Sequence, residues 1–112
     1  MIEVDRLAAQ GDVLFRRIQE LPASVREHSI RGRAVVAHSE TGHDHVIDGG
    51  VRLFERAERD PMICFLSVEG PFADVVHLRP HDTHQTLRLA RGVWEVRRQR
   101  EWTLAGPRVV CD

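Results

Sequence analysis

The sequence predicts one all-β domain, a small antiparallel barrel or sandwich with at most two short helical turns. Three observations favour this class. A chain of 112 residues has the length of a single domain. Its apolar or alternating segments, about five to ten residues long, are separated by Gly and Pro turn signals about every eight to twelve residues, as in sandwiches and barrels. Few segments of the sequence show apolar residues that recur with the period of an α-helix.

The first half of the chain is expected to contain two helical turns and four strands. The turns are predicted at residues 7–9 and 22–27, where Pro22 can begin a short helix. Strands are predicted at residues 12–18, 33–38, 43–48 and 51–56. A tight turn at residues 39–42 would join the second strand to the third. Asp48-Gly49-Gly50 is a typical hairpin signal, because these residues tolerate the positive φ angles of a two-residue turn.

The second half of the chain is expected to add four strands. Residues 62–68 are an apolar run, which indicates burial on both faces, and Glu69-Gly70-Pro71 is expected to end it. Cys64, inside this run, is expected to be a small buried hydrophobe. Later strands are predicted at residues 73–78, 83–89 and 93–102. The predicted core contains Leu14, Val36, Ile47, Leu53, Ile63, Phe65, Val76, Leu87, Leu89, Trp94 and Val96.

The composition argues against several broad classes of protein. A formal net charge of -1 gives no general attraction to nucleic acid or to an anionic membrane. All 16 basic side chains are Arg, a bias that fits a GC-rich genome, so the excess of Arg is not counted as evidence for phosphate binding. The N-terminal residues lack the pattern of a signal peptide, and no apolar run approaches the ~18 residues of a membrane span. We therefore expect a cytoplasmic protein of bacterial type without nucleic-acid or membrane partners.

Six of the 7 histidines lie in two short blocks, at residues 38–45 and 77–84. Neutral imidazole is a nitrogen donor, so clustered histidines indicate either a metal site or a proton-handling pocket. In an extended strand, His43 and His45 project to the same side, about 6.5–7 Å apart at the backbone. Both side chains can therefore reach one metal ion.

The second block contains His81 and His84, whose spacing suits a turn that leads into a strand, because a proline precedes them. If the two blocks lie on neighbouring strands, three or four imidazoles converge. His77 fits either a ligand role or a structural role. His28 and His38 are expected to be structural.

The stretch Thr41-Gly42-His43-Asp44-His45 resembles the first metal motif of the cupin superfamily, in which a glycine-led strand carries His-x-His. The resemblance implies a cupin-like fold that binds a metal through His43 and His45. It also implies that His84 is the histidine from a later strand, with His81 as a fourth or substitute ligand. Asp48 is the carboxylate nearest to the position of the usual acidic ligand.

The chain also resembles a group of small bacterial proteins that share four motifs. The corresponding stretches are Gln10-Gly11-Asp12-Val13, Thr41-Gly42-His43-Asp44-His45, His81-Asp82-Thr83-His84 and Gln99-Arg100-Glu101-Trp102. This resemblance covers most of the chain. It supports the predicted fold and the histidine site, and it implies no particular reaction.

These patterns predict a divalent transition metal bound by His43, His45 and His84, with His81 as a fourth or substitute ligand. Histidine ligands without Cys suit Zn, Fe, Ni, Mn or Cu. Three protein ligands would leave positions open for water or a small-molecule ligand. Glu40 is a candidate general base, and the alternative is that it only shapes the tight turn. The sequence leaves open whether the protein is an enzyme.

Two other classes of function compete with metal binding. In the first, the domain is a non-catalytic interaction or oligomerisation module with structural histidines, and residues 93–102 form an edge strand through which a homodimer pairs. In the second, Arg97, Arg98 and Arg100 bind nucleic acid. Glu95 and Glu101 neutralise much of that positive charge, which favours the interpretation as a charged edge strand.

Overall fold

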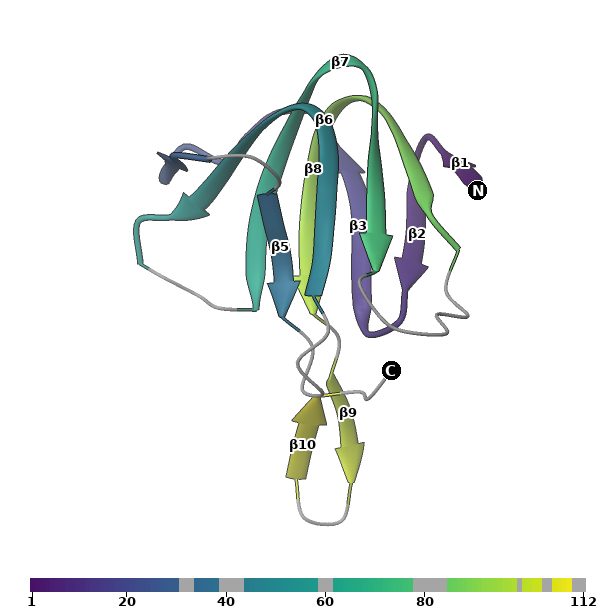
Figure 1. Cartoon of the computed structure of the whole chain (residues 1–112). Helices are drawn as coiled ribbons and strands as arrows, with labels where there is room; N and C mark the ends of the chain where they lie inside the picture. Colours follow the sequence, from purple (N-terminus) through teal and green to yellow (C-terminus); the bar gives the residue numbers. More distant parts are fainter. Residues whose placement is uncertain are drawn as a thin grey trace.

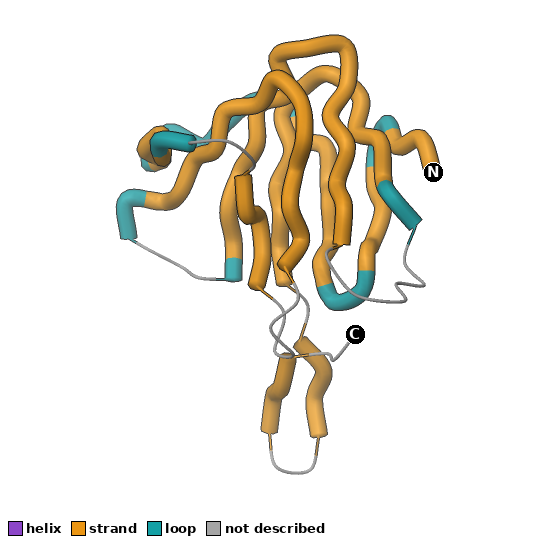
Figure 2. The backbone as a smooth tube through the Cα atoms, viewed as in Figure 1, coloured by secondary structure: helices purple, strands orange, loops and turns teal. Residues whose placement is uncertain are grey.

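A computed structural model describes residues 1–30, 34–38, 44–58, 62–77, 85–98, 100–103 and 106–109. Within these ranges the chain forms strands and no helix, which confirms the all-β prediction (Figure 1, Figure 2). The strands are β1 (Ile2–Val4), β2 (Leu7–Gln10), β3 (Val13–Ile18), β4 (Val25–His28), β5 (Ala34–His38), β6 (Asp44–Arg56), β7 (Ile63–His77), β8 (Leu87–Arg98), β9 (Arg100–Thr103) and β10 (Gly106–Val109). Accordingly, no helix in the described ranges could cross a membrane.

The two predicted helical turns are absent from the described chain. Residues 7–9 lie in β2, which pairs with β3, and residues 25–27 lie in β4, which pairs with β6. These pairings satisfy the backbone amides and carbonyls that face the partner strand, and tertiary pairing of this kind overrides weak local propensity.

Eight strands form one sheet in the order β2-β3-β8-β7-β6-β4, with β1 paired to β8 and β5 paired to β6. The pairings are antiparallel except that of β1 with β8, which is parallel. β9 and β10 form a separate hairpin. The predicted edge strand at residues 93–102 is wrong, because β8 lies inside the sheet between β3 and β7 and residues 100–103 belong to the hairpin.

The three longest strands, β6, β7 and β8, arch over so that the sheet folds on itself (Figure 1). The first half of β6 pairs with β5, and its second half pairs with β4. In the same way, β8 pairs with β1 before its bend and with β3 after it. The domain is therefore sandwich-like, and no pairing among the described residues closes the sheet into a barrel.

The breaks predicted within these strands are bends rather than turns. The pairing register shifts between Gly49 and Val51 and between Val68 and Phe72. Residues 69–72 of β7 lie opposite residue 50 alone in β6, and residues 69–71 lie opposite residue 91 alone in β8, so the additional residues form a bulge in β7. Such a bulge bends the strands without ending the pairing. Gly49, with a φ of 132°, therefore lies at a bend in β6, and the hairpin predicted there is wrong.

We expect Gly49→Ala to destabilise the protein by about 1–3 kcal/mol, because a side chain at this φ is strained. Its Cβ would also lie 3.1 Å from Ala73 Cα and from the Phe72 carbonyl oxygen, which are backbone atoms of the paired strand. Gly50→Ala is the matched control, since the nearest atom to its Cβ would be at an ordinary contact distance of 3.5 Å. Urea unfolding compares the two variants, and equal midpoints would contradict this expectation.

The core lies between the two halves of the folded sheet. Its buried cluster contains Val4, Val13, Phe15, Ala34, Val36, Ile47, Leu53, Leu66, Val68, Ala73, Val75, Leu87, Leu89, Trp94 and Val96. Seven predicted core residues belong to this cluster: Val36, Ile47, Leu53, Leu87, Leu89, Trp94 and Val96. Leu14, Ile63 and Val76 are only partly buried.

The predicted core residues that fall outside the cluster are displaced by one position along their strands. In β3, Val13 and Phe15 face the core and Leu14 does not, and in β7 Leu66 faces the core. Its neighbour Phe65 is buried but belongs to the opposite face of the sheet. Side chains alternate along a strand, so an apolar run without polar partners does not indicate which face it turns inward.

Candidate functional site

The predicted histidine site involves one end of the folded sheet, where β6 begins and β7 ends (Figure 1). His45, in β6, is fully buried there. The other predicted site residues, His43, His81, His84 and Glu40, lie outside the described residues. The register places the backbone of His77 opposite that of His45. The last residue of the first block and the first residue of the second therefore lie on neighbouring strands, and convergence of the remaining imidazoles stays a prediction.

Gln10, the last residue of β2, holds the ring of His45. Its Oε1 lies 2.9 Å from His45 Nδ1. Its Nε2 donates hydrogen bonds to the carbonyl oxygens of Val75 at 3.0 Å and Gln85 at 2.9 Å. Because only the amide NH₂ can donate to carbonyls, these two bonds fix the orientation of the amide and make Oε1 the acceptor. His45 Nδ1 must then carry the hydrogen.

This hydrogen bond selects one tautomer of His45. A neutral imidazole has one protonated nitrogen, so a protonated Nδ1 leaves the lone pair on Nε2. Nε2 lies 3.6 Å from Oδ1 of Asp12, a separation too long for a hydrogen bond. In its neutral form the ring therefore directs a nitrogen donor, suited to a metal ligand or a base, toward a carboxylate oxygen.

Asp12 lies in the turn between β2 and β3 and is 1% exposed. Gly11, with a φ of 59°, supplies the left-handed conformation of this turn. Arg98, at the end of β8, donates to Asp12 Oδ2 from Nη2 at 3.1 Å and from Nε at 3.3 Å. This ion pair joins the β2–β3 turn to the central strand of the sheet and compensates the buried charge of Asp12.

The second oxygen of Asp12 is in a different environment. Oδ1 is buried and accepts no hydrogen bond from any residue that the structure describes. A buried acceptor without a donor costs free energy, so a cation or a further donor placed at this oxygen would be stabilising. The orphaned oxygen and the Nε2 atom of His45 face each other.

The two facing atoms have the spacing of neighbouring metal ligands. Two donors bound at about 2.0–2.2 Å in tetrahedral geometry lie about 3.4 Å apart, close to the 3.6 Å between His45 Nε2 and Asp12 Oδ1. Among the described residues, no group of three or more His, Cys, Asp or Glu side chains could hold a metal ion. A complete site would therefore need ligands from the residues outside the described ranges.

The sequence predicts His45 as a site residue but does not indicate Gln10, Asp12 and Arg98 as the residues around it. A usable signal was present, because two polar residues flank a turn glycine directly before an apolar strand, and polar side chains in that position can face inward. Arg98 was assigned to a charged edge or a nucleic-acid surface. It is instead engaged in an internal ion pair, with its side chain 16% exposed, while Arg97 pairs with Glu95 at 3.2 Å.

Cys64 has the environment of a packing residue rather than a reactive thiol. It packs against the core cluster, and its Sγ lies 3.6 Å from the carbonyl oxygen of Val36. Burial, and secondarily the negative charge of Glu55, raises the pKa of the Cys64 thiol to about 12. The thiol is therefore protonated near neutral pH, which makes it a poor nucleophile and a poor metal ligand.

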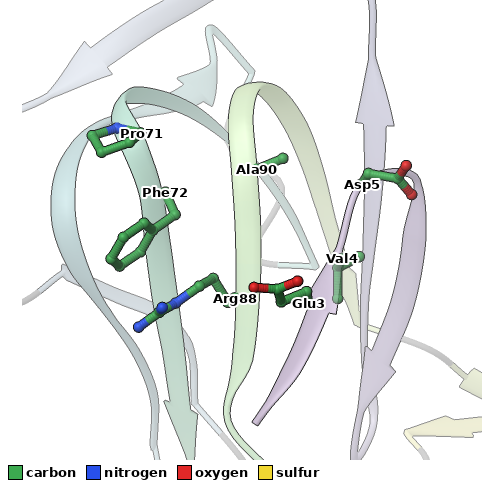
Figure 3. Close-up of a pocket in the computed structure, with 7 residues that line it drawn as sticks. All are labelled: Glu3, Val4, Asp5, Pro71, Phe72, Arg88 and Ala90. Carbon is green, nitrogen blue, oxygen red and sulfur yellow. The ribbon is translucent and has the colours of Figure 1, made fainter.

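A separate surface hollow lies beside β1, β7 and β8 (Figure 3). It is lined by Glu3, Val4, Asp5, Pro71, Phe72, Arg88 and Ala90. The guanidinium of Arg88 lies 3.7 Å from the ring centroid of Phe72 and donates to both carboxylate oxygens of Asp74, at 2.8 and 3.0 Å. Its charge is thus compensated within the sheet, and none of the described residues around His45 lines this hollow.

Residues 9–99 match the family described as Domain of unknown function (DUF8820), and the chain therefore belongs to that family. The matched range includes Gln10, Asp12, His45 and Arg98. No curated protein and no solved structure matches the chain.

Proposed function

We propose that this member of the DUF8820 family is a metal-binding domain that holds one divalent transition metal ion at the end of the sheet where His45 and Asp12 meet. The proposal rests on the orientation of His45. Gln10 holds the hydrogen on Nδ1, so that Nε2 presents its lone pair toward the orphaned Oδ1 of Asp12. One nitrogen and one oxygen donor at this spacing suit a pair of metal ligands.

The remaining ligands of the proposed site are His43 and His84, with His81 as a fourth or substitute ligand. The cupin-like motif at residues 41–45 supports His43, because it is spaced two residues from His45. The register of His77 with His45 supports a contribution from the second block, of which His77 is the first residue. Asp12 is a candidate oxygen ligand that replaces the acidic residue of the cupin motif.

The proposed ligands suit Zn, Fe, Ni, Mn or Cu, because they combine imidazole nitrogen with carboxylate oxygen. The thiol of Cys64 is not counted among them, because it is protonated near neutral pH. The two hydrogen bonds from Arg98 to Asp12 Oδ2 would hold the carboxylate so that Oδ1 points toward the metal. We assign no reaction to the site. Positions left open by the protein ligands would accept water or a small molecule.

We expect protein purified without a histidine tag, loaded with each metal in turn and then desalted, to retain about one equivalent of its preferred metal, measured by elemental analysis. His45→Ala should abolish this binding, because it removes a nitrogen that would bind the metal directly. His43→Ala and His84→Ala are also expected to abolish binding. His45→Ala in addition removes a fully buried side chain, so the other two variants test the loss of ligands separately. A chelator should lower the melting temperature of the parent protein but not of these variants.

His28→Ala is the matched control for this experiment. His28 lies on β4 with its side chain 58% exposed and pairs only loosely with Glu55, at 3.8 Å. Its loss should leave the metal content unchanged. A parent protein that retains no metal under any loading condition would refute the proposal. It would also favour the competing function, an interaction module in which His45 is a structural partner of Gln10 and Asp12.

A further inference from the structure

We infer that Gln10 is a positioning residue of this site, an inference that rests on the proposed function. Its side-chain amide determines which nitrogen of the neutral His45 ring carries the hydrogen, and it ties that ring to the chain on both sides of the second histidine block. Gln10 is 2% exposed, and its side chain makes three hydrogen bonds to described residues, namely His45, Val75 and Gln85.

The first part of the inference concerns the tautomer of His45. The two carbonyl acceptors hold the NH₂ group of Gln10, so its Oε1 can only accept. Without that acceptor, the hydrogen on the neutral ring would be better placed on Nε2, where Asp12 Oδ1 lies within 3.6 Å and has no donor among the described residues. A hydrogen on Nε2 would occupy the atom that the proposed site requires. Gln10 therefore keeps His45 in its ligand form.

The second part concerns the positions that Gln10 connects. Val75 lies near the end of β7, and Gln85 lies shortly before β8 begins. The second histidine block, residues 77–84, falls between these two carbonyl partners. One amide group thus links both flanks of that block to the ring of His45. A side chain that holds these three points together would set the geometry in which the two blocks can share one ion.

The first experiment is NMR spectroscopy of ¹⁵N-labelled, metal-free protein at pH 8, using long-range ¹H–¹⁵N correlations within the histidine rings. In the parent protein we expect His45 as the neutral tautomer with the hydrogen on Nδ1. In Gln10→Met, a near-isosteric variant without donor or acceptor, we expect the hydrogen to move to Nε2. Gln19→Met is the matched control, because Gln19 is exposed and the same substitution there should leave the His45 signals unchanged.

The second experiment measures Zn²⁺ and Co²⁺ affinity for the same proteins. Gln10→Met should bind about 10–100-fold more weakly than the parent, the usual effect of losing a residue that orients a ligand. Gln10→Glu keeps an acceptor for Nδ1–H but has no amide hydrogens for the two carbonyls. This variant should keep the hydrogen on Nδ1 of His45 and still bind metal more weakly. It therefore distinguishes the effect of the His45 tautomer from the effect of losing the hydrogen bonds to Val75 and Gln85. It also provides the test if Gln10→Met does not fold.

The outcomes distinguish this inference from the proposal on which it rests. A parent His45 that is protonated on Nε2 alone, or on both nitrogens, would overturn the role of Gln10 even if the protein binds metal. Unchanged affinity in both Gln10 variants would overturn it as well. If the tautomer responds to Gln10→Met as expected but the parent binds no metal, the proposed function fails and the control of the His45 tautomer by Gln10 stands.

Discussion

Replacing Trp94 by alanine is expected to destabilise the protein by about 3–5 kcal/mol, the range for emptying a buried large aromatic position. Trp94 has no exposed surface, belongs to the core cluster and lies on the central strand β8. Its register partners are Leu66 in β7 and Arg17 in β3, so the cavity would open in the middle of one half of the folded sheet. Its Nε1 also donates to the Ala90 carbonyl oxygen at 2.9 Å, a hydrogen bond that the variant loses.

Phe72→Ala is the control for the Trp94 variant. Phe72 is 41% exposed and contributes mainly a stacking contact with Arg88, so its loss should cost about 1 kcal/mol or less. Equilibrium unfolding in urea, followed by far-UV circular dichroism, measures both free energies. Comparable losses for the two variants would show that the core is not centred between the halves of the sheet.

The second large effect is expected for Arg98→Ala, which should cost about 3 kcal/mol. Its removal leaves the carboxylate of Asp12 buried without its two charged hydrogen bonds. Breaking a buried ion pair from one side costs about 3–5 kcal/mol, because the remaining charge stays uncompensated. The lower end applies here, since the side chain of Arg98 is 16% exposed and water can enter the vacated space.

Arg97→Ala provides a matched control one residue away. The side chain of Arg97 is 47% exposed, and its partner Glu95 keeps a second ion pair with Arg16 at 3.0 Å. The expected loss is therefore below about 1 kcal/mol. The double variant Asp12→Ala/Arg98→Ala should lose less stability than the two single variants added together. Strict additivity in urea unfolding would contradict a coupled ion pair.

The class of the fold was determined by local features of the sequence. The existence of β3 and β5 follows from short, largely apolar segments between turn signals, and the inward face of Trp94 and Val96 follows from the alternation of apolar and polar residues in β8. The absence of long helices followed from the absence of a helical period. Composition and turn residues act through neighbouring positions in the chain, so they can be assessed without knowing the partners of a segment.

The path of the sheet was decided only by tertiary pairing. A glycine with a positive φ serves equally well in a hairpin turn, as at Gly11, and at a bend within a long strand, as at Gly49 opposite the bulge in β7. Which of these occurs depends on whether the flanking segments pair with each other or with other strands. The inward face of β7 depended on the same pairings, because its bulge changes which residues point to the core.

The candidate site divides in the same way. The sequence by itself indicated His45 as a member of a histidine cluster, because the spacing of His-x-His is a local property. The contacts of His45 with Gln10 and Asp12 span 35 and 33 positions of the chain, and the ion pair of Asp12 with Arg98 spans 86. Only the folding of the sheet brings the β2–β3 turn, the start of β6 and the end of β8 together. Three polar residues, Gln10, Asp12 and Arg98, are thereby placed around the buried imidazole ring of His45, where their hydrogen bonds and charges act at low dielectric constant.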